Sequence, residues 1–181
     1  MFEQFHTPAL FLTLQHVLQV VLSFYALRHS YVAITNLRKY EETTKKAAEW
    51  SDEAQKQLDK TRTTMGAGAI TTTLSLLSAL TLILYPQMYS PWTRAFISPT
   101  LLAITIGARH YIKNFWAPGA TDSKGKDQGT RVPLPKMGDY NLAVQKTEDL
   151  LKCLEYLEYS WVITSLFGSK VLSGALMGWW K

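Results

Sequence analysis

The chain has 181 residues, of which 47 % are hydrophobic and 18 % are charged, and its formal net charge is +5. This composition excludes a disordered tail, and the length suits a single domain. The charges are unevenly distributed, because residues 28–62 carry eight basic and six acidic side chains and residues 109–152 carry eight basic and five acidic ones. The segments between these blocks are apolar, which indicates a polytopic membrane protein rather than an ordinary soluble domain.

Two apolar segments are predicted as membrane spans at residues 7–26 and 67–85. The first has no charged residue and is followed by Arg28 and His29, and the second is rich in Ile, Leu and hydroxyl residues and stops at Pro86. Each approaches the roughly 20 residues that a spanning helix needs. The N-terminus lacks a basic signal region and an Arg-rich presequence, so we expect the first segment to be retained as a span.

Two further spans are predicted at residues 98–116 and 161–180. Ser98 followed by Pro99 predicts a helix start, with serine as the N-cap and proline in the first turn. The apolar run that follows is short, so this third segment is the weakest and could be re-entrant. A full crossing requires Arg109 to extend its side chain toward the interface. The fourth segment has tryptophans near both ends, as interfacial anchors do.

The topology follows from the basic blocks. If all four segments cross, both blocks lie on the same side of the membrane, which the positive-inside rule makes the cytosolic or matrix side. Three crossings would place the blocks on opposite sides. We therefore predict an all-α, four-span helical bundle that forms a single membrane domain over residues 1–181.

The charged segments have their own predicted structures. Residues 30–62 contain acid-before-base pairs four residues apart and a helix-start pattern at Ser51, which together predict a helical hairpin outside the membrane. Residues 117–139 are rich in Gly, Pro and charge, which predicts a flexible loop. Residues 140–160 carry an apolar stripe and are predicted as an amphipathic helix that leads into the fourth span.

Lys170 is the most unusual residue, because a lysine near the middle of a span costs about 2.5–3.5 kcal/mol on insertion scales. It could extend to an interface, or it could bind a lipid phosphate or a carboxylate. Gln15, His16 and Gln19 lie near the middle of the first span and are expected to form hydrogen bonds between helices, with Lys170 as a candidate partner.

Basic residues at the inner ends of the first and third spans form a predicted collar. Anionic lipid headgroups are natural partners for it, and plain topological anchoring is the alternative. Its members are Arg28, His29, Arg109, His110 and Lys113, together with Arg38 and Lys39.

Small residues at helical spacing predict close helix packing. Gly174 and Gly178 form a GxxxG motif in the fourth span, and Ala103 with Gly107 forms a small-xxx-small motif in the third. The contact could be within the chain or with another one.

No catalytic motif is present, and the single cysteine, Cys153, excludes an internal disulfide and CxxC chemistry. We expect no catalytic residues, no cofactor, no metal and no nucleic-acid partner.

The predicted function is a non-enzymatic accessory, assembly or scaffold subunit of a membrane protein complex, with lipids and other membrane subunits as partners. The alternative is a small membrane enzyme or lipid-binding protein that acts on a lipophilic or anionic-lipid substrate. The short, hydroxyl-rich spans favour the endoplasmic reticulum, with the mitochondrial inner membrane second.

Overall fold

The computed structural model describes the backbone of residues 6–48, 52–116 and 138–178, and side chains within residues 10–40, 59–116 and 138–168. The elements in chain order are α1 (His6–Ala48), α2 (Asp52–Leu84), a 3₁₀ turn η2 (Pro86–Met88), α3 (Pro91–Trp116) and α4 (Gly138–Gly178). Every regular element in the described ranges is helical, so the all-α prediction is confirmed.

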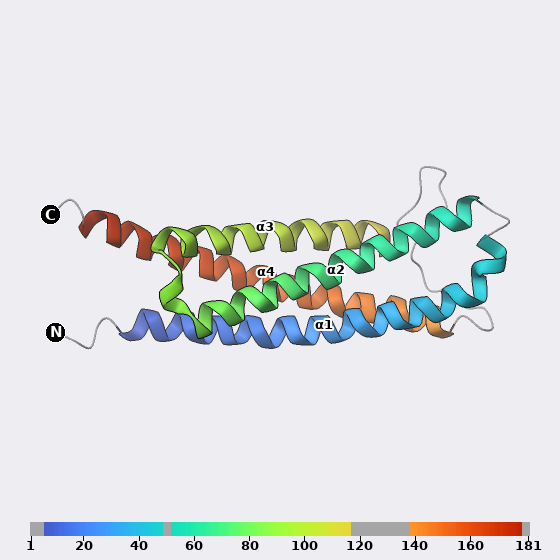
Figure 1. The fold of residues 1–181 in the computed structure, drawn as a ribbon, viewed down its shortest axis with the longest axis horizontal. Helices are drawn as coiled ribbons and strands as arrows, with labels where there is room; N and C mark the ends of the chain where they lie inside the picture. Colours follow the sequence, from blue (N-terminus) through green and yellow to red (C-terminus); the bar gives the residue numbers. More distant parts are fainter. Residues whose placement is uncertain (1–5, 49–51, 117–137, 179–181) are drawn as a thin grey trace.

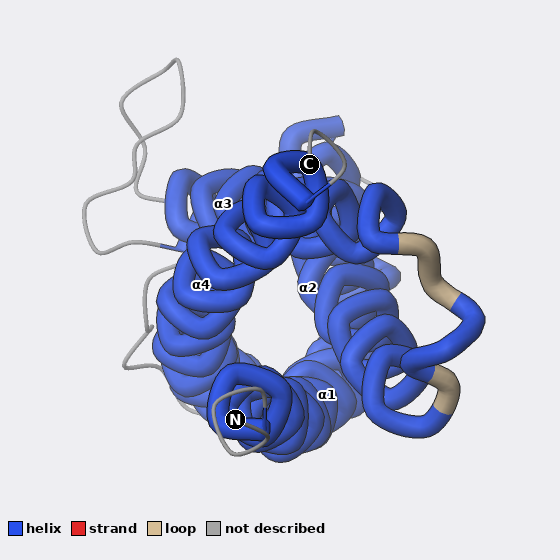
Figure 2. Tube along the Cα trace, turned by 90° about the vertical axis from the view of Figure 1, so that its left-hand side faces the viewer, coloured by secondary structure: helices blue, strands red, loops and turns tan. Residues whose placement is uncertain are grey.

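The four helices form an elongated bundle in which consecutive helices run in opposite directions (Figure 1). Helix α1 packs along both α4 and α2, and α3 packs along α4 and less extensively along α2. Seen from the end, α1 and α3 lie diagonally opposite each other (Figure 2). The start of α1, the end of α4 and η2 lie at one end of the bundle, and the end of α1, the start of α2, the end of α3 and the start of α4 lie at the opposite end (Figure 1). We call this opposite end the inner end.

The helices are longer than the predicted spans. Helix α1 continues without a break from the first apolar segment to Ala48, and α2 begins at Asp52, next to the predicted helix start. Helix α4 joins the predicted amphipathic helix and the fourth apolar segment into one element. Most of the predicted loop lies outside the described residues, although α4 already begins at Gly138.

The predicted start of the third helix at Ser98 is wrong. Helix α3 begins at Pro91, and Pro99 lies inside it. The observed start carries the same Ser-Pro pattern, since Ser90 precedes Pro91. Ser90 Oγ accepts a hydrogen bond from the Thr93 backbone N–H at 3.2 Å, as the side chain of an N-cap residue does. Pro99 is exposed on the outer surface, and the Thr100 hydroxyl donates to the Phe96 carbonyl at 2.8 Å beside it. Because Pro99 has no N–H, the carbonyl of Ala95, four residues earlier in the helix, lacks its backbone donor.

Polar and apolar side chains are distributed unlike those of a soluble bundle. Many side chains that are buried between the helices carry hydroxyl or amide groups, and many large apolar ones are exposed. The buried polar set includes Gln15, Gln19, Ser23, Thr71, Thr72, Ser75, Thr105, Thr147, Ser160 and Thr164. The exposed apolar set includes Leu10, Leu14, Val21, Phe24, Ile70, Leu77, Leu84, Phe96, Ile106, Val162 and Leu166.

Two stretches are long and apolar enough to cross a membrane, Leu10–Tyr40 in α1 and Asp59–Leu84 in α2. Only 22 % and 33 % of their most apolar windows are buried, whereas the core helix of a soluble protein would be mostly buried. No such stretch is found in the described parts of α3 and α4. Arg109 and Lys113 interrupt α3, and α4 carries several charged residues up to Glu158 and a further one at Lys170. The described residues therefore form four helices, of which two are candidate spans.

Aromatic side chains connect the helices at the inner end. The ring centroid of Tyr140 on α4 lies 5.1 Å from the ring centroid of Tyr40 on α1 and 6.2 Å from that of Trp116 on α3. The indole N–H of Trp116 donates to the Thr64 hydroxyl on α2 at 3.1 Å. Burial, with a smaller contribution from Tyr40, raises the pKa of Tyr140 to about 12.

This pKa predicts a loss of stability in strong alkali. The folded chain holds Tyr140 as the neutral phenol, whereas in the unfolded chain it ionises near pH 10. Its contribution to stability is therefore complete below about pH 10 and is lost as the pH rises toward about 12. An absorbance titration of the nine tyrosines should show one phenol with a pKa near 12. The Tyr140→Phe variant should lack that step, and an unchanged titration curve would contradict the assignment.

Candidate functional site

The candidate site is the polar interior of the bundle, together with the ion pairs that α4 forms with α1 and α3. Gln15 and Gln19 lie one helical turn apart on α1, so their side chains share one face. Gln15 Nε2 donates to Ser160 Oγ at 3.0 Å, and Gln19 Nε2 donates to Thr164 Oγ1 at 2.9 Å. Ser160 and Thr164 are likewise one turn apart on α4. These four side chains join α1 to α4 through buried hydrogen bonds.

His16 extends this network on α1. Its Nδ1 lies 2.8 Å from Gln19 Oε1, and its ring lies 6.4 Å from that of Trp161. The side chain of His16 is half-buried. The structure thus brings together all three polar residues that the sequence singled out in the first span.

Ser75 on α2 is the meeting point of three helices. Its hydroxyl oxygen lies 3.1 Å from the donating Ser23 hydroxyl on α1 and 3.0 Å from the indole N–H of Trp161 on α4. Trp161 is fully buried. Buried indole N–H groups need an acceptor, so Ser75 stabilises the large side chain that fills the bundle interior at this level.

The predicted partnership of the glutamines with Lys170 concerns a side chain outside the described residues. The packing around Gly174 and Gly178 likewise lies outside the described residues, although their backbone belongs to α4. The described partners of Gln15 and Gln19 are hydroxyl groups of α4.

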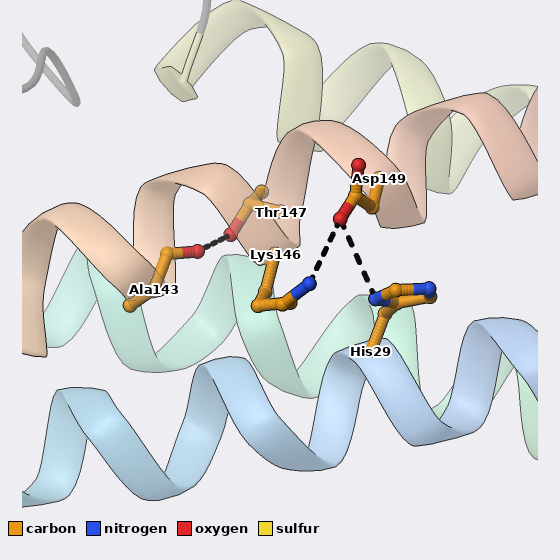
Figure 3. Close-up of polar contacts among 5 residues, drawn as sticks. All are labelled: His29, Ala143, Lys146, Thr147 and Asp149. Atoms are coloured by element: carbon orange, nitrogen blue, oxygen red, sulfur yellow. Dashed lines mark hydrogen bonds and ion pairs between the residues drawn. The ribbon is translucent and has the colours of Figure 1, made fainter.

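His29 forms a polar cluster with two residues of α4 (Figure 3). Its Nδ1 lies 3.7 Å from Asp149 Oδ2, and Lys146 Nζ donates to the same oxygen at 3.1 Å. The ring of Tyr25 meets the imidazole edge-on at 4.5 Å. His29 is 7 % exposed, and in the described structure its buried Nε2 has no hydrogen-bond partner.

Arg109 joins α3 to α4 by two ion pairs. Its guanidinium lies 2.8 Å from Glu158 Oε2 and 3.2 Å from Glu155 Oε2. Glu158 is the more buried of these two acids, with a side chain that is 12 % exposed. Hydrogen bonds between such ionised partners are stronger than neutral ones.

The predicted basic collar therefore divides into two groups. His29 and Arg109 pair with acidic residues of α4, and Arg28, His110 and Lys113 are exposed at the surface. The Arg28-His29 pair of α1 and the Arg109-His110 pair of α3 consequently differ in orientation. His29 points into the bundle in α1, whereas Arg109 does so in α3.

The thiol of Cys153 lies within the bundle on α4. Burial, with the nearby Asp149 carboxylate second, raises its pKa, which disfavours the reactive thiolate. Within the described ranges, no group of three His, Cys, Asp or Glu residues is placed to hold a metal ion.

The small-residue motif of α3 lies on the outside of the bundle. Gly107 and Ala103 are both exposed, and a Cβ built on Gly107 would meet no atom within 4 Å. His110 and Asn114 continue the same outward face at helical spacing. Gly68 on α2 behaves differently, because a Cβ there would come within 2.9 Å of Leu150.

Sequence reasoning missed the partners that α4 contributes. Ser160 and Thr164 have the same four-residue spacing as the glutamines, and this was a usable signal for a shared face. Asp149, Glu155 and Glu158 were not singled out from the sequence, and in the structure they pair with basic residues of other helices. Comparison with known protein families, with characterised proteins and with solved structures finds no match to this chain.

The bond between Gln19 and Thr164 should contribute a measurable coupling energy. In a double-mutant cycle with Gln19→Leu and Thr164→Val, unfolding in detergent micelles should give a coupling of about 0.6 kcal/mol, and at most about 1.7 kcal/mol. Thr73→Val is the matched control, because its exposed hydroxyl donates to the Ala69 carbonyl of its own helix. Thr73→Val should be additive with Gln19→Leu. Additivity of both pairs would contradict the interhelical bond.

Proposed function

We propose that this chain is a four-span membrane protein that acts as a non-enzymatic accessory or scaffold subunit of a larger membrane complex. The observation that carries this proposal is the combination of a bonded polar interior with an apolar exterior. A lipid environment offers polar groups no partner, so they must bond to one another inside the protein. Gln15, Gln19, Ser75 and Trp161 do this in the described structure.

All four helices display large apolar side chains, which supports membrane crossing by α3 and α4 as well as by α1 and α2. Representative side chains and their exposed fractions are Phe24 on α1 at 66 %, Ile70 on α2 at 63 %, Phe96 on α3 at 65 % and Leu166 on α4 at 60 %. In water such a surface would be a large aggregation-prone patch. In a bilayer it is the expected lipid contact.

Exposed aromatic residues mark two levels about one bilayer apart. Trp92 and Tyr111 on α3 are both about half exposed and lie about 28 Å apart at 1.5 Å per residue. The hydrocarbon core of a bilayer is about 30 Å thick, and tryptophan and tyrosine gather at its two interfaces. Tyr85 is exposed just beyond the end of α2, close in the chain to Trp92, and Tyr156 on α4 is exposed two residues before the ion-paired Glu158.

The outward face of α3 supports a partner subunit. Ala103 and Gly107 allow another helix to approach closely, and they do not serve packing within this chain. His110 and Asn114 add polar groups on the same face. We propose that a transmembrane helix of a different protein binds there.

The four-span topology predicts that the two ends of the bundle lie on opposite sides of the membrane. Gln87 and Asp139 are exposed at opposite ends, near the termini and at the inner end respectively. Single cysteines at these positions, in a Cys153→Ser background, should react with an impermeant thiol reagent from opposite sides of sealed vesicles. Labelling of both from one side would overturn the topology.

If a partner helix binds the outward face of α3, a larger side chain there should release this chain from the complex. Gly107→Leu should leave the fold intact, because there is space for its Cβ, and it should block close approach of a second helix. In native electrophoresis of membranes solubilised in mild detergent, the wild-type chain should migrate as part of a larger species, and Gly107→Leu should migrate alone.

The matched control is Thr73→Leu, which adds similar bulk to an exposed position on α2. It should leave the larger species intact. Mass spectrometry of that species identifies its subunits. A wild-type chain that migrates alone would contradict the proposal, as would a species that contains only copies of this chain.

A further inference from the structure

A cavity of about 320 Å³ lies between α1 and α2, toward the inner end of the bundle. Its lining combines apolar side chains with two guanidinium groups and one hydroxyl. The apolar residues are Ile34, Leu37 and Met65, and the polar ones are Arg38, Thr61 and Arg62. Leu37, Met65 and Thr61 are buried, whereas both arginines are exposed at the rim. The cavity therefore has an apolar floor and a cationic opening.

The cavity lies at the charged ends of both predicted spans and close to an exposed aromatic residue of α3. Arg38 follows the predicted span 7–26 on α1, and Arg62 precedes the predicted span 67–85 on α2. The Tyr111 hydroxyl donates to the Thr63 hydroxyl, next to Arg62, at 3.1 Å. Tyr31, which is 70 % exposed, lies about two turns from Arg38 on the apolar side. In an inserted bundle this is the level of the lipid headgroups, where arginines extend toward phosphates.

We propose that this cavity binds the headgroup of an anionic glycerophospholipid. The phosphate lies between Arg38 and Arg62, and the glycerol and first methylenes contact Leu37 and Met65. A guanidinium presents paired N–H donors that match the oxygens of a phosphate. The inference rests on the membrane insertion proposed above and does not depend on the partner subunit.

The existing ion pair of Arg62 is compatible with this role. Arg62 lies 3.5 Å from Asp59 on the same helix, and both side chains are more than half exposed. Exposed pairs of this kind contribute little to stability, so the Asp59 pair does not prevent the guanidinium from also binding a phosphate. Arg38 comes from the other helix, so an anion between the two arginines joins α1 to α2.

The size of the cavity also fits this ligand. Its volume is at the lower end of the roughly 300–1,000 Å³ that is typical of ligand pockets. It has room for a headgroup and the glycerol but not for two acyl chains. The chains would continue along the exposed apolar side chains of α1 and α2, such as Phe24 and Ile70.

The test measures lipid binding to the full chain by native mass spectrometry in detergent, with phosphatidylserine and phosphatidylcholine as probes. The wild type should bind one phosphatidylserine more tightly than phosphatidylcholine. The double variant Arg38→Gln with Arg62→Gln should lose about tenfold in phosphatidylserine affinity, because it removes the charge-assisted hydrogen bonds. Inorganic phosphate should not compete at equal concentration, because it lacks the apolar part.

The matched control is the double variant Lys39→Gln with Lys60→Gln. It removes the same charge from exposed neighbours that do not line the cavity. It should keep phosphatidylserine affinity within about twofold, since only diffuse attraction is weakened. Equal losses in the two double variants would overturn the site in favour of general attraction to the basic surface.

Gly66→Leu provides a second variant that retains every charge. Gly66 lines the cavity, and a Cβ there meets no atom within 4 Å, so the leucine should be accepted and should fill the space. Phosphatidylserine binding should fall as in the arginine variant, while helical circular dichroism stays unchanged. Unchanged lipid binding in Gly66→Leu would overturn the proposal, as would equal wild-type affinity for the two lipids. Neither result would alter the labelling pattern that tests membrane insertion.

Discussion

The structure depends on hydrogen bonds that join buried polar side chains of different helices. The surface around the interior is apolar, so a group that lost its partner there would gain no solvent in exchange. The Gln19 amide donates a hydrogen bond to the Thr164 hydroxyl, and the Trp161 indole N–H donates one to the Ser75 hydroxyl. Both bonds are directional and short, so they fix how far α1, α2 and α4 can slide or rotate against one another. Apolar contacts alone would tolerate a shift by one turn much more readily.

The ion pairs between helices are organised by α4, which packs against both α1 and α3. Its acidic residues face basic ones on either side, Asp149 toward His29 and Glu158 toward Arg109. Arg109 points inward and pairs with Glu155 and Glu158, whereas Arg28, His110 and Lys113 are exposed on the outer surface. In the proposed membrane orientation, anionic headgroups would be the natural partners of these exposed groups.

Periodicity and charge predicted the helices well because both act locally. The polar face of α1 was visible in the spacing of Gln15 and Gln19. Their partners were not predicted, because hydroxyl residues are common in apolar helices and their orientation depends on packing. The start of α3 was misplaced because Ser90 and Ser98 both precede a proline, and the choice between them depends on the η2 turn. The hydroxyl residues of α2 suggested a thin membrane, yet side chains such as Ser75 serve contacts between helices.

The two proposed interaction surfaces lie on different parts of the bundle. The cavity is formed by α1 and α2, whereas Gly107 lies on the outside of α3, and α1 and α3 are diagonally opposite in the bundle (Figure 2). A lipid between Arg38 and Arg62 therefore leaves the outer face of α3 open to a partner helix. By joining α1 to α2 near the inner end, such a lipid would stabilise the pair of helices that extends furthest beyond the apolar region. Because α2 also contacts α3 through the bond from Trp116 to Thr64, the two surfaces share one rigid support.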